Sequence, residues 1–353
     1  MGGALLAGLV CEPKEPVSQQ IAAWDESDIL CKAVVSLKRQ GAKILPAQLI
    51  MRVEELGRQA GGLLGRSADD GFDTVEDQRL MKLCRMMVHV GLTIDQEPGP
   101  ALFENATRRI EQETIRILRK MDDRSSWDRL RLRRRKGFDG ETIEEAARHV
   151  VQKLFLQVQE QFEGLDEAGQ RRVAERIISE IEKLDAATQD EVRRRLGINQ
   201  LSVDALRKTG VLAGLGTGLG TAVVMGGFGS YTLLTSTMAS MAGVLGVTLP
   251  FKFYILATST MAFLANPVTI VVAALGGGWL LRAKANRAIR DKYFVVLAAL
   301  AVVARGTGAH EADTIDEFSD HARRRYREFR EASGTKRKSY ARVFPAFRQG
   351  PVR

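Results

Sequence analysis

Two long stretches without any charged residue most constrain the fold of this chain of 353 residues. Residues 211–251 contain no Asp, Glu, Lys or Arg, and after Lys252 residues 253–281 contain none either. A helix that crosses a bilayer needs roughly 20 mostly apolar residues, so each stretch is long enough to cross. Pro250 favours a turn between them. The sequence therefore predicts a hydrophobic helical hairpin over residues 211–281.

Glycine is frequent in the first half of this hairpin, at a spacing that favours close helix packing. Gly214 and Gly218 form one GxxxG pair, and Gly216 and Gly220 form a second. In a bilayer, small residues at this spacing let helix backbones approach each other where lipid gives no hydrophobic drive for association. We therefore expect these glycines to be helix-packing positions, and we count a homo-oligomer among the expected assemblies.

Basic residues flank the hairpin and carry the excess charge of the chain. The net charge is +9, and residues 282–353 alone hold 17 Lys and Arg against 8 Asp and Glu. Basic flanks favour the cytoplasmic side of a membrane, and bases close to a membrane attract an anionic leaflet. We expect membrane-surface contacts from Arg282, Lys284, Arg287, Arg290, Lys292, Arg323, Arg324 and Arg325. This predicts a protein of the cytoplasmic membrane whose N-terminal and C-terminal regions are cytosolic.

The basic residues 306–353 allow three interpretations. Aromatic residues such as Tyr326, Phe329 and Tyr340 interleave with the bases, which is typical of a segment that lies on a membrane surface. The same composition is also compatible with a solvated, partly disordered tail, or with nucleic-acid binding by stacking. Because no nucleic-acid-binding motif is present, nucleic acid is not among the partners that we expect.

Helical periodicity dominates the remaining sequence and predicts an all-α fold, a helical bundle with the glycine-rich hairpin embedded in the membrane. Ile110, Ile117 and Met121 form one apolar stripe, for example. The predicted helices include residues 75–92, 104–121, 141–163 and 166–184. A further apolar run, residues 293–304, is too short to span a bilayer and is expected to be a core helix or an interfacial segment.

These features divide the chain into four predicted parts. They are an N-terminal helical region over residues 1–138, a helical hairpin domain over 139–209, the hydrophobic glycine-rich membrane hairpin plus a packed helix over 210–305, and a basic C-terminal tail over 306–353. The first boundary follows a basic stretch that ends in a Gly-Phe-Asp-Gly break.

No pattern of residues typical of catalysis or metal binding is present in the sequence. The histidines, His89, His149, His310 and His321, are scattered, and neither HExxH nor GxSxG occurs. We expect His89 to be a packed helix residue. Of the three cysteines, Cys31 and Cys84 fall at apolar positions and are expected to be buried thiols. We therefore expect no catalytic residue, no metal, no cofactor and no enzymatic activity.

Residues 145–184, followed by the glycine-rich VLAGLGTGLGTA of residues 211–222, resemble the bacterial YaaW-type family, which sequence groupings place alongside the ubiquinol–cytochrome c chaperone proteins. The resemblance covers roughly residues 140–300. It implies an all-helical, non-enzymatic protein, and a chaperone relative would bind a membrane-protein client. The chain departs from the soluble chaperones by its much longer hydrophobic hairpin. Similar hairpins occur in pore-forming toxins, which is an analogy of pattern only.

The sequence thus favours a membrane-associated, non-enzymatic helical protein whose hairpin anchors in or inserts into the lipid bilayer. Such a protein could be a membrane-active effector, as a pore or as a bacterial defence or toxin-like protein. Two alternatives stay open. One is a chaperone or assembly factor for a membrane protein, and the other is a soluble helical scaffold that keeps the hairpin buried.

Overall fold

The structure, a computed structural model, describes the helices on both sides of the predicted hairpin. The described residues are 3–12, 14–25, 72–124, 138–163, 166–182, 278–305 and 311–348, with a few more between 186 and 207. In these ranges every regular element is an α-helix, and one isolated β-bridge joins Ile94 to Phe347. The all-α prediction is therefore confirmed for this part of the chain.

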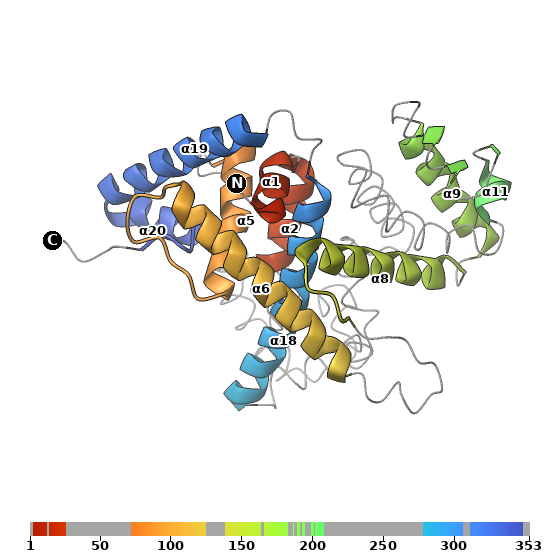
Figure 1. Cartoon of the computed structure of the whole chain (residues 1–353), viewed down its shortest axis with the longest axis horizontal. Helices are drawn as coiled ribbons and strands as arrows, with labels where there is room; N and C mark the ends of the chain where they lie inside the picture. Colours follow the sequence, from red (N-terminus) through yellow and green to blue (C-terminus); the bar gives the residue numbers. More distant parts are fainter. Residues whose placement is uncertain are drawn as a thin grey trace, which may run out of the picture.

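Most of the described helices pack into one body, and α9 and α11 pack against each other apart from it (Figure 1). The described helices are α1 (Ala4–Cys11), α2 (Lys14–Asp25), α5 (Val75–His89), α6 (Pro100–Arg124), α8 (Ile143–Glu163), α9 (Glu167–Ile181), α11 (Val203–Arg207), α18 (Gly278–Val303), α19 (Glu311–Glu331) and α20 (Gly334–Val343). Figure 1 shows α19 and α20 on one side of the molecule, and α9 and α11 on the opposite side, beyond the end of α8. The helices α5, α6, α8 and α9 coincide with the periodic stretches of the sequence.

The centre of the core is apolar and joins the two ends of the chain. Helix α1 is buried along its whole length, from Ala4 to Val10, and it packs against the second half of α18, where residues 293–304 are all buried. Helix α18 also packs against α8 and α6. Since residues 293–304 are buried among the described helices, this apolar run is a core helix, which is one of the two alternatives that the sequence predicted.

Gly8 sets the distance between α1 and α18. A Cβ atom at this position would lie 1.7 Å from the carbonyl oxygen of Ala301 on α18. Two helix backbones can approach this closely only where a side chain is missing. Any side chain at this position would therefore push the two helices apart.

Helix α5 is buried on nearly all of its faces, because α1, α2, α6 and α19 pack around it. It begins with a capping box, in which the Thr74 hydroxyl accepts from the backbone N–H of Asp77 and the Asp77 carboxylate accepts from the backbone N–H of Thr74. Cys84 is fully buried on this helix, as predicted, and burial raises the pKa of its thiol to about 12. Cys31 lies outside the described residues.

Helices α19 and α20 pack onto the body through their aromatic residues. Phe318, Tyr326 and Phe329 of α19 are buried, and so are Tyr340 of α20 and Phe344 after it. Residues 311–348 therefore form two packed helices with a short extension, and a solvated tail does not describe them.

The predicted hairpin falls almost entirely outside the described residues. Only residues 278–281 are described, as the first turn of α18. The predicted packing glycines, Gly214, Gly216, Gly218 and Gly220, lie outside the described residues. Within the helices that the structure does describe, none combines the length and the apolar character that crossing a membrane requires.

Candidate functional site

Helix α18 changes character halfway along its length, at the downstream end of the uncharged segment. Its first turns extend beyond the other labelled helices in Figure 1, and Arg287 and Arg290 are exposed there. The side chains of Arg282 and Lys284 lie outside the described set. From Tyr293 onward the same helix is buried in the core. A continuous helix therefore connects the end of the uncharged segment to the centre of the body.

Lys292 lies at the point where α18 enters the core. Its side chain is half-buried, and burial lowers its pKa to about 8. The pKa falls because desolvation penalises the ammonium form of the lysine. Of the predicted membrane-surface residues of α18 whose side chains are described, Arg287 and Arg290 are exposed and Lys292 is half-buried.

Aromatic and polar contacts from α2 and α5 hold α18 at this same point. The Nε2 atom of His89 lies 3.2 Å from a carboxylate oxygen of Asp291. The His89 ring stacks on Phe294 with centroids 4.5 Å apart, and Trp24 meets it edge-on at 5.6 Å. His89 is therefore a packed helix residue, as predicted, and its contacts fix where the exposed half of α18 ends.

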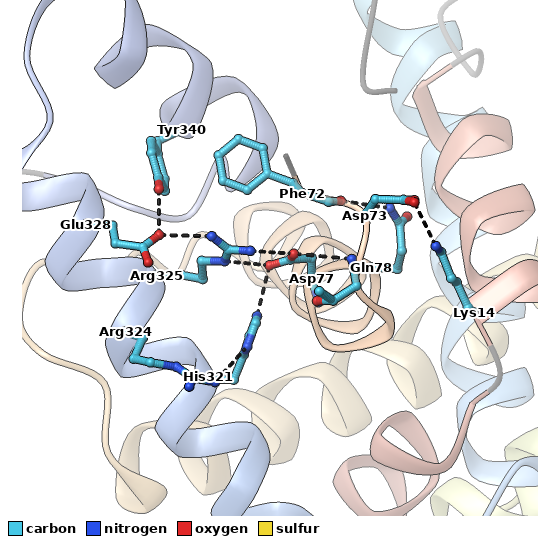
Figure 2. A network of polar contacts seen from close by, with 11 residues as sticks. Lys14, Phe72, Asp73, Asp77, Gln78, His321, Arg324, Arg325, Glu328 and Tyr340 are labelled. Atoms are coloured by element: carbon cyan, nitrogen blue, oxygen red, sulfur yellow. Dashed lines mark hydrogen bonds and ion pairs between the residues drawn. The ribbon is translucent and has the colours of Figure 1, made fainter. Parts of the chain in front are cut away.

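A second polar cluster joins α5 to α19, and Figure 2 shows its centre at Asp77. Arg325 of α19 donates two hydrogen bonds to the Asp77 carboxylate, from Nε and from Nη2, each 2.7 Å long. His321 Nε2 donates a third, at 2.9 Å. Burial alone would raise the pKa of Asp77, but the hydrogen bonds from His321, Arg325 and Thr74 outweigh it and hold this pKa at about 2. Asp77 is therefore a permanent anion at neutral pH.

The cluster continues from Arg325 to α20. Arg325 Nη1 donates to Glu328 at 2.9 Å, and the Tyr340 hydroxyl donates to the same carboxylate oxygen at 2.6 Å. Burial and this hydrogen bond to Glu328 raise the pKa of Tyr340 to about 12. The Arg325 guanidinium also lies over the Phe72 ring, 5.1 Å from its centroid. Arg325 of α19 thus contacts α5 through Asp77 and the segment before α5 through Phe72, and its partner Glu328 contacts α20.

The three neighbouring arginines of α19 that the sequence assigned to a membrane surface have different surroundings. Arg325 turns inward to Asp77. Arg323 donates from Nε to the carbonyl oxygen of Pro98 and from Nη1 to Asp320. Arg324 is exposed, and its Nη2 donates to Nδ1 of His321 at 3.4 Å. Surface contact stays a prediction for all three, and Arg324 has the exposure that it needs.

A third polar contact, between α5 and the α1–α2 junction, is completely enclosed. Lys82 Nζ donates to both carboxylate oxygens of Glu12, at 2.7 and 2.6 Å, and both side chains are fully buried. Gln20 Nε2 also donates to Glu12, at 3.2 Å. Burial lowers the pKa of Lys82, and the Glu12 carboxylate opposes this effect. An enclosed charge needs such a partner, because water is absent.

These contacts position helices; they do not assemble reactive groups. Within the described part of the chain, no group of three or more His, Cys, Asp or Glu side chains is placed to hold a metal ion. The Asp77 carboxylate accepts hydrogen bonds from His321 and Arg325, and these bonds occupy both of its oxygens. The arrangement therefore locks α19 and α20 onto α5.

Sequence reasoning did not find this cluster. Asp77 and Arg325 are 248 positions apart, and neither belongs to a sequence motif that predicts a contact with the other. The local signal in the sequence is Thr74, because a threonine three residues before an acidic residue is typical of the start of a helix. Comparisons of the chain with protein-family models, with curated proteins and with solved structures give no match, and the resemblance to the YaaW-type family stays a prediction.

Proposed function

We propose that this chain is a membrane-anchored helical protein. Residues 211–281, which carry Lys252 as their one charged residue, insert into a lipid bilayer as a helical hairpin, and the described helices form a body on the cytoplasmic side. The length of the two uncharged stretches supports insertion, because each exceeds the roughly 20 apolar residues that a bilayer requires. The described helices share an apolar core, in which α1 and the second half of α18 are buried.

The observation that carries the proposal is the continuity of α18. Its first turn contains the last uncharged residues, its exposed turns present Arg287 and Arg290, and its second half lies in the core. Bases directly after an apolar segment favour the cytoplasmic side and remain near the headgroups. A rigid helix of this kind would hold the body at a fixed place beside the bilayer.

Extraction of isolated membranes with alkaline carbonate tests the proposal. The full chain is expected to resist extraction, and a chain without residues 211–277 is expected to be released. Two point variants, Val224→Arg and Leu264→Arg, test the same idea without a deletion. A charge at the centre of a membrane helix costs about 3 kcal/mol, so the double variant is expected to become extractable.

Val88→Arg is the control for each arginine substitution taken singly, because Val88 is exposed on α5 and the change adds one positive charge outside the uncharged stretches. This control is expected to resist extraction like the unmodified chain. Equal extraction of the unmodified chain and the Val224→Arg, Leu264→Arg variant would contradict insertion. If the unmodified chain resists extraction, dye leakage from vesicles that contain the protein separates a pore from an anchor.

A further inference from the structure

We propose that α20 and the segment after it form a basic face that binds the anionic surface of a lipid bilayer. The face is defined by Lys336, Lys338, Arg342 and Arg348, which are all exposed. The inference deepens the proposed function, on which it rests for the presence of a membrane. It adds a second, peripheral contact that is far from the hairpin in sequence and that acts through charge alone.

The charge of this region is one-sided. Glu331 is the last acidic residue in the sequence, and residues 332–353 contain Lys and Arg but no Asp or Glu. On α19, by contrast, bases alternate with acids and form ion pairs, such as Arg323 with Asp320 and Arg327 with Glu97. The excess positive charge of the C-terminal helices is therefore concentrated on α20 and its extension.

The body holds this basic face in a fixed position. On its inner side, α20 donates the Tyr340 hydrogen bond to Glu328. Phe344 contacts the Phe72 ring edge-on, with centroids 5.4 Å apart. The backbone N–H of Arg348 donates to the carbonyl oxygen of Ile94 at 2.8 Å. These contacts fasten the second half of the segment, and the Arg337 guanidinium lies over the Phe329 ring, 5.4 Å from its centroid, nearer the start of α20. The backbone that carries the exposed bases is therefore held in place, and little conformational entropy is lost on binding.

The burial of the aromatic residues favours a membrane surface over single-stranded nucleic acid. Proteins that bind single strands stack bases on exposed aromatic rings. Here the five aromatic residues between the bases are all inside the body: Tyr326, Phe329, Tyr340, Phe344 and Phe347. The exposed side of α20 therefore offers charge without stacking surfaces. Positive charge alone is enough to attract a membrane surface of anionic headgroups, and each base near such a surface contributes about 1 kcal/mol of attraction.

The test is a vesicle-binding experiment with a full chain whose hairpin cannot insert. The Val224→Arg, Leu264→Arg chain is mixed with vesicles of zwitterionic lipid, or with vesicles that also contain about one-third anionic lipid. Binding is expected only to the anionic vesicles and is expected to weaken as salt shortens the range of electrostatic attraction. The further changes Lys336→Gln, Lys338→Gln, Arg342→Gln and Arg348→Gln are expected to weaken binding at least about a hundredfold, at about fivefold per base.

A matched control removes the same charge from another exposed surface. Arg108 and Arg109 on α6, with Arg171 and Arg172 on α9, are exposed, and their change to Gln is expected to leave binding within about threefold. Equal losses in both variants would overturn the assignment, since net charge would then explain binding. Binding of the α20 bases to duplex nucleic acid but not to anionic vesicles would overturn it as well. Failure of the hairpin to insert is detected in a different experiment, because carbonate would then extract the unmodified chain from membranes.

Discussion

The contact of α1 with α18 and the contact of α5 with α19 both join an early part of the chain to a late part, but they do so by opposite means. Where α1 packs on the second half of α18, residues 4–10 and 293–304 are buried and nearly all apolar, and the helices approach until Gly8 contacts the backbone of Ala301. Between α5 and α19 the contact centres on a buried charge, Asp77, with three hydrogen bonds from His321 and Arg325. The first contact therefore depends on shape, and the second depends on a complete set of partners.

The difference determines which substitution each contact can tolerate. An apolar contact accepts changes of chemistry that preserve volume, and it resists added volume. A buried polar cluster accepts small changes of volume, and it resists the loss of a partner, because the remaining charge is then left without solvation. In the sequence, α1 and α5 precede the two uncharged stretches, and α19 and nearly all of α18 follow them. We therefore expect both contacts to stabilise the attachment of α18 to the body.

The largest effect is expected from Gly8→Leu. The new Cβ would lie 1.7 Å from the Ala301 oxygen, which belongs to the backbone and cannot rotate away. Helices α1 and α18 would have to separate, and we expect a loss of about 5 kcal/mol in the free energy of unfolding, at the top of the range for single substitutions. Urea denaturation in mild detergent, followed by circular dichroism, measures it.

Gly99→Ser is the control for this substitution. Gly99 has open space around the position of a Cβ, and it stands just before α6, where serine is a favourable residue. Its free energy of unfolding is expected to stay within about 0.5 kcal/mol of that of the unmodified chain. A similar small effect for Gly8→Leu would show that α1 does not pack closely on α18.

A smaller but still large effect is expected from Asp77→Asn. The variant keeps the volume of the side chain but removes the charge that Arg325 and His321 contact. Because Arg325 retains Glu328 as a partner, we expect a loss of about 3 kcal/mol, the lower end for breaking a buried pair. Denaturation with the double variant Asp77→Asn, Arg325→Gln isolates the coupling between the two residues.

The exposed pair of Arg327 and Glu97 provides the comparison for this cluster. Its two side chains are 62% and 47% exposed, so Arg327→Gln is expected to cost less than about 1 kcal/mol. Equal losses for Asp77→Asn and Arg327→Gln would show that the cluster at Asp77 is no more important than a surface ion pair.

Acid should weaken the α5–α19 contact within a defined pH range. Asp77 has a pKa of about 2 in the folded protein against an ordinary value of 3.8, so the folded state favours its ionised form. The corresponding stabilisation is fully present above the ordinary value and is lost as the pH falls toward 2. It amounts to about 2 kcal/mol. The difference in unfolding free energy between the unmodified chain and Asp77→Asn is therefore expected to shrink between pH 4 and pH 2, and a constant difference would contradict this account.

The apolar periodicity of the sequence predicted much of the fold, because helical spacing is a local property. Ile110 and Ile117 are buried on α6, and residues 293–304 lie in the core, as their patterns indicated. The burial of Cys84 followed from its apolar neighbours in the same way. Helix α1 was missed for a related reason. Its eight residues carry no polar face, and a helix that is apolar all round has no periodicity to detect.

The polar clusters were not predictable, because their members come from distant parts of the chain. Lys82 stands among apolar residues of α5, and no neighbouring residue in the sequence indicates that its ammonium group will pair with Glu12. Likewise the bases of α19 look alike in the sequence, although Arg325 is directed into the body and Arg324 is exposed. Which base turns inward is decided by the position of Asp77, and that position depends on the fold as a whole.

The smallest effect is expected from Tyr340→Phe, at the edge of the α5–α19 cluster. The variant removes the hydroxyl that donates to Glu328, but Glu328 keeps its contact with Arg325, and we expect a loss of about 1 kcal/mol. The pKa of Tyr340 is raised from 10.0 to about 12, so this contribution is complete below pH 10 and is lost as the pH rises through 12. The difference between the ultraviolet absorbance titrations of the unmodified chain and of Tyr340→Phe isolates the ionisation of this residue. Ionisation near pH 10 would mean that the hydroxyl does not contact Glu328, and α20 would then be fastened by its apolar side alone.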